Sequence, residues 1–236
     1  MRKYKVNEQF FEVWSNDMAY VLGVIASDGC LFIDKEKRKS IRIGININDI
    51  DWLKSIRSLI GSNHQIYERQ EDNIALLCIG SKKMFDDIIQ IGIHPKKSLN
   101  LKFPQMPEKH KSHFVRGYFD GDGYVGKLND GKGNIYLRCS ISGTKEFLSE
   151  LKQVFSKIYE KEIGSIRFAH RCYELTYGGN KSIRDFFTWV YMNSNPNTRL
   201  ERKYTQLQRL CSNNVIEVSV SPPTFENVGI RNATIL

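Results

Sequence analysis

The chain contains two similar nine-residue segments. Residues 21–29 (VLGVIASDG) and residues 115–123 (VRGYFDGDG) align without a gap, 94 positions apart. A segment that recurs within one chain indicates that a structural unit recurs with it. This repeat restricts the possible folds more than any other feature of the sequence.

The residues that follow each copy also match in pattern. Apolar residues alternate over 41–47 in the first copy and over 135–141 in the second, as in a half-buried strand. Helices are then predicted to begin near Asp49 and Thr144, with apolar stripes over 52–60 and 147–155. Two more strand-like runs and a second helix follow in each copy. We therefore predict an α+β protein made of two pseudo-symmetric half-domains of element order α-β-β-α-β-β-α.

The half-domains are predicted to span residues 10–98 and 112–210. Residues 99–111 form the predicted linker, because Pro104 and Pro107 interrupt regular structure there. Residues 211–236 have no counterpart in the repeat. We predict a strand at 215–219 in this C-terminal tail and assign the tail no function.

Small residues recur at helical spacing within the two matched segments. Gly23 and Ser27 are four residues apart, as are Gly117 and Gly121, so each pair shares one face of a helix. Small residues at this spacing allow two helix backbones to approach closely. We therefore predict that the two segments form helices packed against each other, and that the glycines at 29 and 123 leave them in the left-handed conformation.

Each matched segment ends in an aspartate, Asp28 or Asp122, at the predicted helix C-terminus. A carboxylate there meets the negative end of the helix dipole and, across the interface, the second carboxylate. A hard divalent cation such as Mg²⁺ would relieve this repulsion, and such ions promote hydrolysis of phosphodiesters. A single Asp-Gly pair is more often a turn, but its recurrence inside matched repeats favours a functional pair.

The composition favours a polyanionic partner. The chain has 35 basic and 26 acidic residues, a net charge of +9, which suits the neutralisation of phosphates. The five cysteines are scattered and include no Cys-x-x-Cys pair, so we expect reduced thiols and neither disulfides nor a zinc site. The longest apolar run, residues 20–26, is too short to cross a membrane, and no secretion signal is predicted.

The two segments resemble the LAGLIDADG signature, and residues 10–210 resemble the repeated half-domains of the LAGLIDADG homing endonucleases. The resemblance implies a monomer with two antiparallel sheets that form a saddle over double-stranded DNA. It implies site-specific double-strand cleavage with staggered 3′ overhangs, in a bacterial, phage or organellar setting. The expected cofactor is Mg²⁺, with Mn²⁺ or Ca²⁺ able to substitute for binding.

The resemblance also assigns residues to the site. Asp28 and Asp122 are the expected metal ligands and catalytic acids, with the backbone carbonyls of Ser27 and Gly121 as further ligands. Lys97 is the expected catalytic lysine; its aligned partner in the second copy is Thr198, next to Arg199. Asn46 or Asn48 would position a metal-bound water. Asp120 is read as structural, because Ala26 stands at the equivalent position.

The predicted strands carry the candidate DNA contacts, for which a solvated surface role is the alternative. They are Lys37, Arg38, Arg42, Asn46, Asn48, Arg69, Tyr136, Arg138, Arg167, Arg171 and Tyr173.

Two other functions were weighed for the same fold. A binding protein that does not cut, acting as a transcription regulator or as a maturase on intron RNA, remains the alternative. Retention of two mutually repelling carboxylates argues against a role in binding alone. An intein is not expected, because the two repeats leave no room for splicing blocks around them.

Overall fold

The computed structural model describes residues 4–129, 135–160, 163–169 and 171–212. It contains two four-stranded antiparallel sheets with helices, so the predicted α+β class is confirmed. The elements of the first repeat are α1 (Asn16–Asp28), β1 (Gly29–Ile33), β2 (Lys39–Asn46), α2 (Ile50–Leu59), β3 (Ile66–Arg69), β4 (Ile74–Ile79) and α3 (Lys82–Ile91).

The second repeat has the same element order and then one more helix. Its elements are α4 (Lys111–Asp122), β5 (Gly123–Asn129), β6 (Ile135–Gly143), α5 (Lys145–Tyr159), β7 (Ser165–Ala169), β8 (Cys172–Gly178), α6 (Asn180–Tyr191) and the additional α7 (Glu201–Ser212). The predicted strand at 215–219 lies outside the described residues.

The two sheets have equivalent topologies. The strand orders are β1-β2-β4-β3 and β5-β6-β8-β7, and every neighbouring pair is antiparallel. In β2 the alternate residues Ile41, Ile43 and Ile45 are buried, so one face of the first sheet packs on the core. The other face carries the intervening residues.

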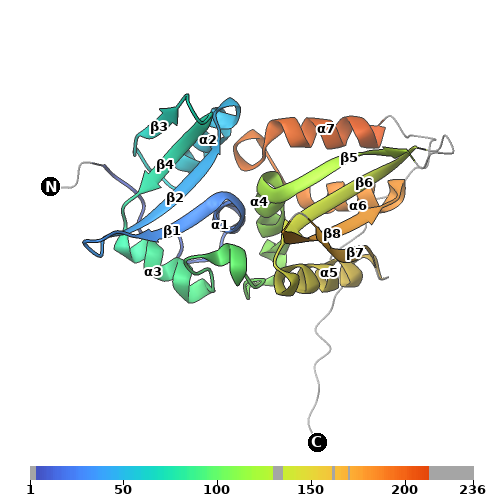
Figure 1. Ribbon diagram of the computed structural model, residues 1–236, viewed down its shortest axis with the longest axis horizontal. Coiled ribbons are helices and arrows are strands. Elements are labelled where there is room, and N and C mark those ends of the chain that lie inside the picture. The colour runs from blue at the N-terminus through green and yellow to red at the C-terminus, as the bar shows by residue number, and fades with distance from the viewer. Residues whose placement is uncertain (1–3, 130–134, 161–162, 170, 213–236) are drawn as a thin grey trace, which may run out of the picture.

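Helices α1 and α4 pack side by side at the centre of the molecule, with one sheet on each side (Figure 1). A Cβ atom on Gly23 would lie 2.1 Å from the Phe114 carbonyl oxygen, and one on Gly117 would lie 2.1 Å from the Tyr20 carbonyl oxygen. Any side chain at either position would therefore force the two helix backbones apart. The small residues act as predicted, and the contacts are nearly symmetric.

The predicted left-handed exits from these helices are wrong. Gly29 and Gly123 have φ values of −88° and −86°, so both are extended and begin β1 and β5 directly. A Cβ atom would lie 2.6 Å from the Ile25 carbonyl oxygen at Gly29 and 2.5 Å from the Phe119 carbonyl oxygen at Gly123. Glycine is required there by the sharp change from helix to strand, which presses the backbone against the preceding turn.

The starts of α2 and α5 differ in their capping. The Thr144 hydroxyl accepts a hydrogen bond from the Phe147 amide, as expected of an N-cap. Asp49 precedes α2 but makes no such bond, because its carboxylate accepts two-pronged hydrogen bonds from Arg202 on α7. Asp49 therefore links the two halves of the chain. Among the described residues, no helix combines the length and apolarity that crossing a bilayer requires.

Candidate active site

Asp28 and Asp122 are the last residues of α1 and α4, the two helices that pack together at the centre. Their side chains lie close to each other and to Gly121, where a Cβ atom would be 2.0 Å from Asp28 Oδ2. The Ser27 hydroxyl donates to that same oxygen at 3.0 Å. The packing that keeps Gly121 free of a side chain thus leaves space for the Asp28 carboxylate.

Both carboxyl groups resist ionisation. Desolvation, followed by the charge of Asp28, raises the pKa of Asp122 to about 6, although Asp122 as a whole residue is exposed to solvent. Burial also raises the pKa of Asp28, and the hydrogen bond from Ser27 partly opposes this. Two carboxylates held together in this way favour a cation between them.

Lys97 lies in a short 3-10 turn (Lys97–Leu99) after the first repeat. It is buried, and its Nζ donates to the Ser27 carbonyl oxygen at 2.6 Å. Burial lowers the pKa of Lys97, while the charges of Asp122 and Asp28 counteract that decrease. The structure thus brings Lys97 and both aspartates together.

A second lysine, Lys203 on α7, lies at the same centre and was not predicted. Its buried Nζ donates to the carbonyl oxygens of Phe119 and Gly121, at 2.8 and 2.9 Å. Burial lowers the pKa of Lys203 to about 8, against the opposing charges of Asp120, Asp28 and Asp122. Lys97 and Lys203 therefore bond to equivalent backbone positions, each to the carbonyl that directly precedes a motif aspartate.

The residues aligned with Lys97 in the second copy have other roles. Thr198 is buried in a 3-10 turn (Pro196–Thr198), where it forms a capping box with Asn195. Arg199 pairs with Glu201 at 2.8 Å. Alignment of the second copy with Lys97 could not identify Lys203, because Lys203 belongs to an element outside the repeat. One sequence signal was available, since Lys203 shares the helical face of the apolar Leu207 and Cys211, where a lysine is unusual.

The donor atoms at this centre suit a hard divalent cation. Asp28, Asp122 and the carbonyls of Ser27 and Gly121 provide only oxygen ligands, which Mg²⁺ and Ca²⁺ prefer. Each carbonyl already accepts a lysine hydrogen bond, but a carbonyl oxygen has a second lone pair. No group of three or more His, Cys, Asp or Glu able to hold a metal occurs in the described parts of the chain. Waters and phosphate oxygens would therefore have to complete the coordination.

The predicted water-positioning residues lie beside a hollow between the two halves. Asn46 is exposed, and its side-chain oxygen accepts from the Asn48 amide, closing a tight turn. Both asparagines line the hollow of about 580 Å³, together with Asp49 and Arg202. Neither motif aspartate lines it.

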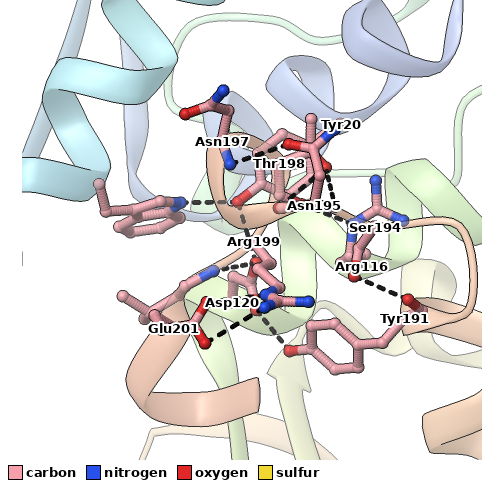
Figure 2. A network of polar contacts seen from close by, with 12 residues as sticks. Tyr20, Arg116, Asp120, Tyr191, Ser194, Asn195, Asn197, Thr198, Arg199 and Glu201 are labelled. Atoms are coloured by element: carbon pink, nitrogen blue, oxygen red, sulfur yellow. Dashed lines mark hydrogen bonds and ion pairs between the residues drawn. The ribbon is translucent and has the colours of Figure 1, made fainter. Parts of the chain in front are cut away.

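Asp120 is fully buried in a polar network that joins both repeats (Figure 2). Its carboxylate accepts hydrogen bonds from the hydroxyls of Tyr20 and Tyr191 and from the Leu200 amide. The indole of Trp52 in turn donates to the Tyr20 hydroxyl at 2.6 Å. Burial raises the pKa of Asp120 to about 6, against the effect of these donors. Asp120 thus holds the residue before α7, the helix that carries Lys203.

The candidate DNA contacts of the first half occupy the tip and the open face of its sheet. Lys37 and Arg38 lie in the β1–β2 turn, where Arg38 pairs with Asp34 and Glu36. Arg42 and Arg69 lie on β2 and β3, and Arg69 pairs with Asp72 at 3.3 Å.

In the second half the candidates are divided between the two faces of the sheet. Arg138 and Arg167 lie on the open face; Arg167 is paired in register with Glu174, and Arg138 forms a salt bridge with the same glutamate at 3.4 Å. Tyr173 instead lies on the core side of β8, packed against the core. Arg171 is exposed in the β7–β8 turn, and the side chain of Tyr136 lies outside the described residues.

Comparison with known proteins supports this architecture. The sequence profile of the LAGLIDADG-like domain matches residues 109–190. The chain is 28% identical over 200 residues to a "probable translation initiation factor IF-2" of Methanocaldococcus jannaschii, a match that covers 78% of this chain. The same match spans only 16% of that much longer protein.

Solved structures of similar fold include LAGLIDADG proteins in complex with DNA. The meganuclease I-AabMI bound to uncleaved DNA aligns with a TM-score of 0.58 and 16% identity, over 82% of this chain and 89% of that one. The homing endonuclease I-LtrWI bound to target DNA aligns with a TM-score of 0.55 and 13% identity, over 87% and 91% of the two chains. The predicted resemblance is thereby confirmed: this chain has the fold of these two-domain LAGLIDADG structures, and its residues 109–190 match the LAGLIDADG-like domain.

Proposed function

We propose that this protein is a site-specific DNA endonuclease that hydrolyses one phosphodiester in each strand of a double-stranded target. The observation that carries the proposal is the pairing of Asp28 and Asp122 at the helix ends, each with a raised pKa and each beside a buried lysine. Such a pair costs stability unless a cation and a polyanion use it.

The chain's own residues have distinct parts in this proposal. Asp28 and Asp122 would hold divalent ions, Mg²⁺ in the cell, with the Ser27 and Gly121 carbonyls. A bound ion would stabilise charge on the scissile phosphate and activate water. Lys97 and Lys203, both cationic and partly desolvated, would stabilise negative charge that develops on the phosphate oxygens. The pKa of Lys203, lowered to about 8, also suits this lysine to transfer a proton near neutral pH.

The near-symmetric centre suits two cuts made on opposite strands by one monomer. The two sheets lie on either side of the α1–α4 pair, so each is placed to contact one half of a target (Figure 1). The positive net charge favours the DNA backbone. Staggered 3′ overhangs are part of the proposal.

The test uses purified protein, Mg²⁺ and a large pool of random duplex DNA, followed by sequencing of the ends produced. We expect recurrent staggered ends at one long site, absent with EDTA and reduced by at least about a thousandfold in Asp28→Asn and Asp122→Asn. Both variants should still enrich the site by binding. Asp51→Asn is the matched control, because Asp51 is an exposed carboxylate on α2 that pairs only locally with Lys54.

Two outcomes would contradict the proposal. Full double-strand cleavage by either active-site variant would remove the carboxylates from the reaction. Enrichment of one DNA sequence without any cleavage by the wild-type protein would identify a binder that does not cut. Comparable affinity for structured intron RNA would favour the maturase alternative.

A further inference from the structure

The open faces of the two sheets differ in chemistry. In the first sheet, β1 and β4 each contribute a cysteine, Cys30 and Cys78, on either side of Arg42. The next position of β2 is Gly44, opposite Leu76, which is itself opposite Tyr67. The members of this face, defined here as the apolar face, are Cys30, Phe32, Ser40, Arg42, Gly44, Asn46, Tyr67, Arg69, Ile74, Leu76 and Cys78. Only two of them carry a charge.

The corresponding face of the second sheet is polar. Ser140 lies between Tyr124 and Thr176, and Ser142 lies opposite Glu174. Arg138 donates to both Glu174 and Thr176 at 3.4 Å. In equivalent register, Thr176 stands where the first sheet presents the Cys78 thiol, and Glu174 stands where it presents Leu76.

Gly44 leaves a gap on the apolar face that methyl groups surround. A Cβ atom placed on Gly44 would lie 3.7 Å from Leu76 Cδ1 and 3.9 Å from Ile74 Cγ2, which is ordinary van der Waals contact. The space above the Gly44 Cα is therefore open and flanked by Leu76 and Ile74, so a methyl group from outside can approach the backbone there and contact both side chains. Leu76 and Ile74 are both partly exposed, so the gap is open to a ligand.

Arg42 lies at the middle of this face, between Cys30 and Cys78. Its guanidinium carbon lies 3.5 Å from the centre of the Phe32 ring, a stacked cation–π contact. Its buried Nε has no hydrogen-bond partner. A guanidinium can donate two parallel hydrogen bonds, as arginine does to guanine.

In the major groove, thymine differs from the other bases by its C5-methyl group, which apolar side chains contact. Hydrogen-bonding side chains instead read the donors and acceptors of the base edges. We propose that the first sheet selects its half-site through thymine methyl groups placed against the apolar face around Gly44, with Arg42 bound to one guanine. The second sheet selects its half-site through hydrogen bonds. This inference rests on the proposed action on DNA and adds the base chemistry that each half recognises.

The test replaces thymine by uracil, which lacks only the methyl group. The wild-type protein first enriches a target from random duplexes in Ca²⁺. That target is then synthesised with uracil in one half at a time, and the dissociation constants are compared. Loss of one methyl contact is worth about fourfold in affinity, so uracil in the first sheet's half should weaken binding about fourfold per contact. Uracil in the other half should change binding less than about twofold.

Variants assign the halves and serve as controls. Arg42→Ala should lose one guanine preference, and the position of that base identifies the first sheet's half. Gly44→Ala fills the gap and should abolish the preference for thymine over uracil at the base pair it faces. Arg138→Ala is the matched control, since it should alter selection in the second half and leave the thymine preference intact.

The outcomes separate this inference from the proposed function. Specific binding with equal affinity for thymine and uracil in both halves would overturn the inference and leave DNA recognition standing. Methyl dependence confined to the second sheet's half would also overturn it. Failure to enrich any target would overturn the proposed function and, with it, this inference.

Discussion

In the first half of the molecule the active-site lysine, Lys97, lies in a short turn between the repeats, whereas in the second half Lys203 lies on a helix, α7, outside the repeat. Lys97 bonds one backbone carbonyl and Lys203 bonds two. The two halves therefore place the same chemical group at the same centre by different structural routes. Symmetry is maintained at the aspartates and lost in the elements that support them.

The residue two positions before each aspartate shows the same difference. Ala26 is buried among apolar neighbours, whereas Asp120 is buried among hydroxyl and amide donors. Through the Leu200 amide, Asp120 anchors the chain just before α7. The comparison indicates why only the second half has a polar anchor. Its lysine lies on an added helix whose start must be fixed, whereas the lysine of the first half lies in the turn that directly follows the repeat.

The largest expected effect separates the two lysines. Lys97→Met and Lys203→Met retain an unbranched chain that approximates the aliphatic part of each lysine and remove the charged amine. Each substitution should therefore slow cleavage by about a hundredfold to ten-thousandfold. If each lysine serves one strand, single variants should accumulate nicked plasmid, and the double variant should yield neither product. Gel analysis of supercoiled plasmid carrying the target measures both steps. Equal slowing of both strands by one variant would show that the lysines act as one unit.

The second, smaller effect concerns stability. It is tested by substitutions at positions 26 and 120, the equivalent positions of the two halves. Asp120→Ala leaves buried donors without an acceptor and should lower the free energy of unfolding by about 3 kcal/mol. Ala26→Asp should destabilise by at least as much, because it buries a carboxylate among apolar groups. Urea denaturation followed by circular dichroism measures both changes. A neutral Ala26→Asp substitution would contradict the proposed difference between the halves.

The smallest effect concerns Asp122 in the metal-free protein. Its folded pKa of about 6 exceeds the ordinary value of 3.8, so the folded state binds the proton more tightly. The resulting stabilisation is complete below the ordinary value and is lost as pH rises through about 6. At neutral pH, Asp122→Asn should therefore be more stable than the wild type, by about 1 kcal/mol after allowance for solvent screening.

Thermal unfolding in EDTA at pH 4 and at pH 7.5 checks this sign. The gain in stability from Asp122→Asn should be present at pH 7.5 and nearly absent at pH 4. Asp28→Asn provides the comparison across the interface, and its gain should be smaller, since Ser27 stabilises the charged form of Asp28. A gain in stability that is the same at both pH values would show that it does not come from removing the charge of Asp122.

Much of the architecture was predictable because it is encoded locally. The repeat, the period-two alternation of Ile41, Ile43 and Ile45 and the helical stripes determined two αββαββα units, since each pattern reports which face of an element is buried. The four-residue spacing of Gly23 with Ser27 and of Gly117 with Gly121 likewise indicated the helix contact. The recurrence of Asp28 and Asp122 indicated the centre.

Only the tertiary structure decided which distant groups complete that centre. Lys203 reaches Gly121 from 82 residues away, on a helix with no repeat partner, so no alignment of the two copies could identify it. The extended backbone of Gly29 and the inward face of Tyr173 likewise depend on how the chain leaves one element and packs on another. Periodicity along a sequence records burial within an element, whereas hydrogen-bond partners and close approaches arise only when elements pack together.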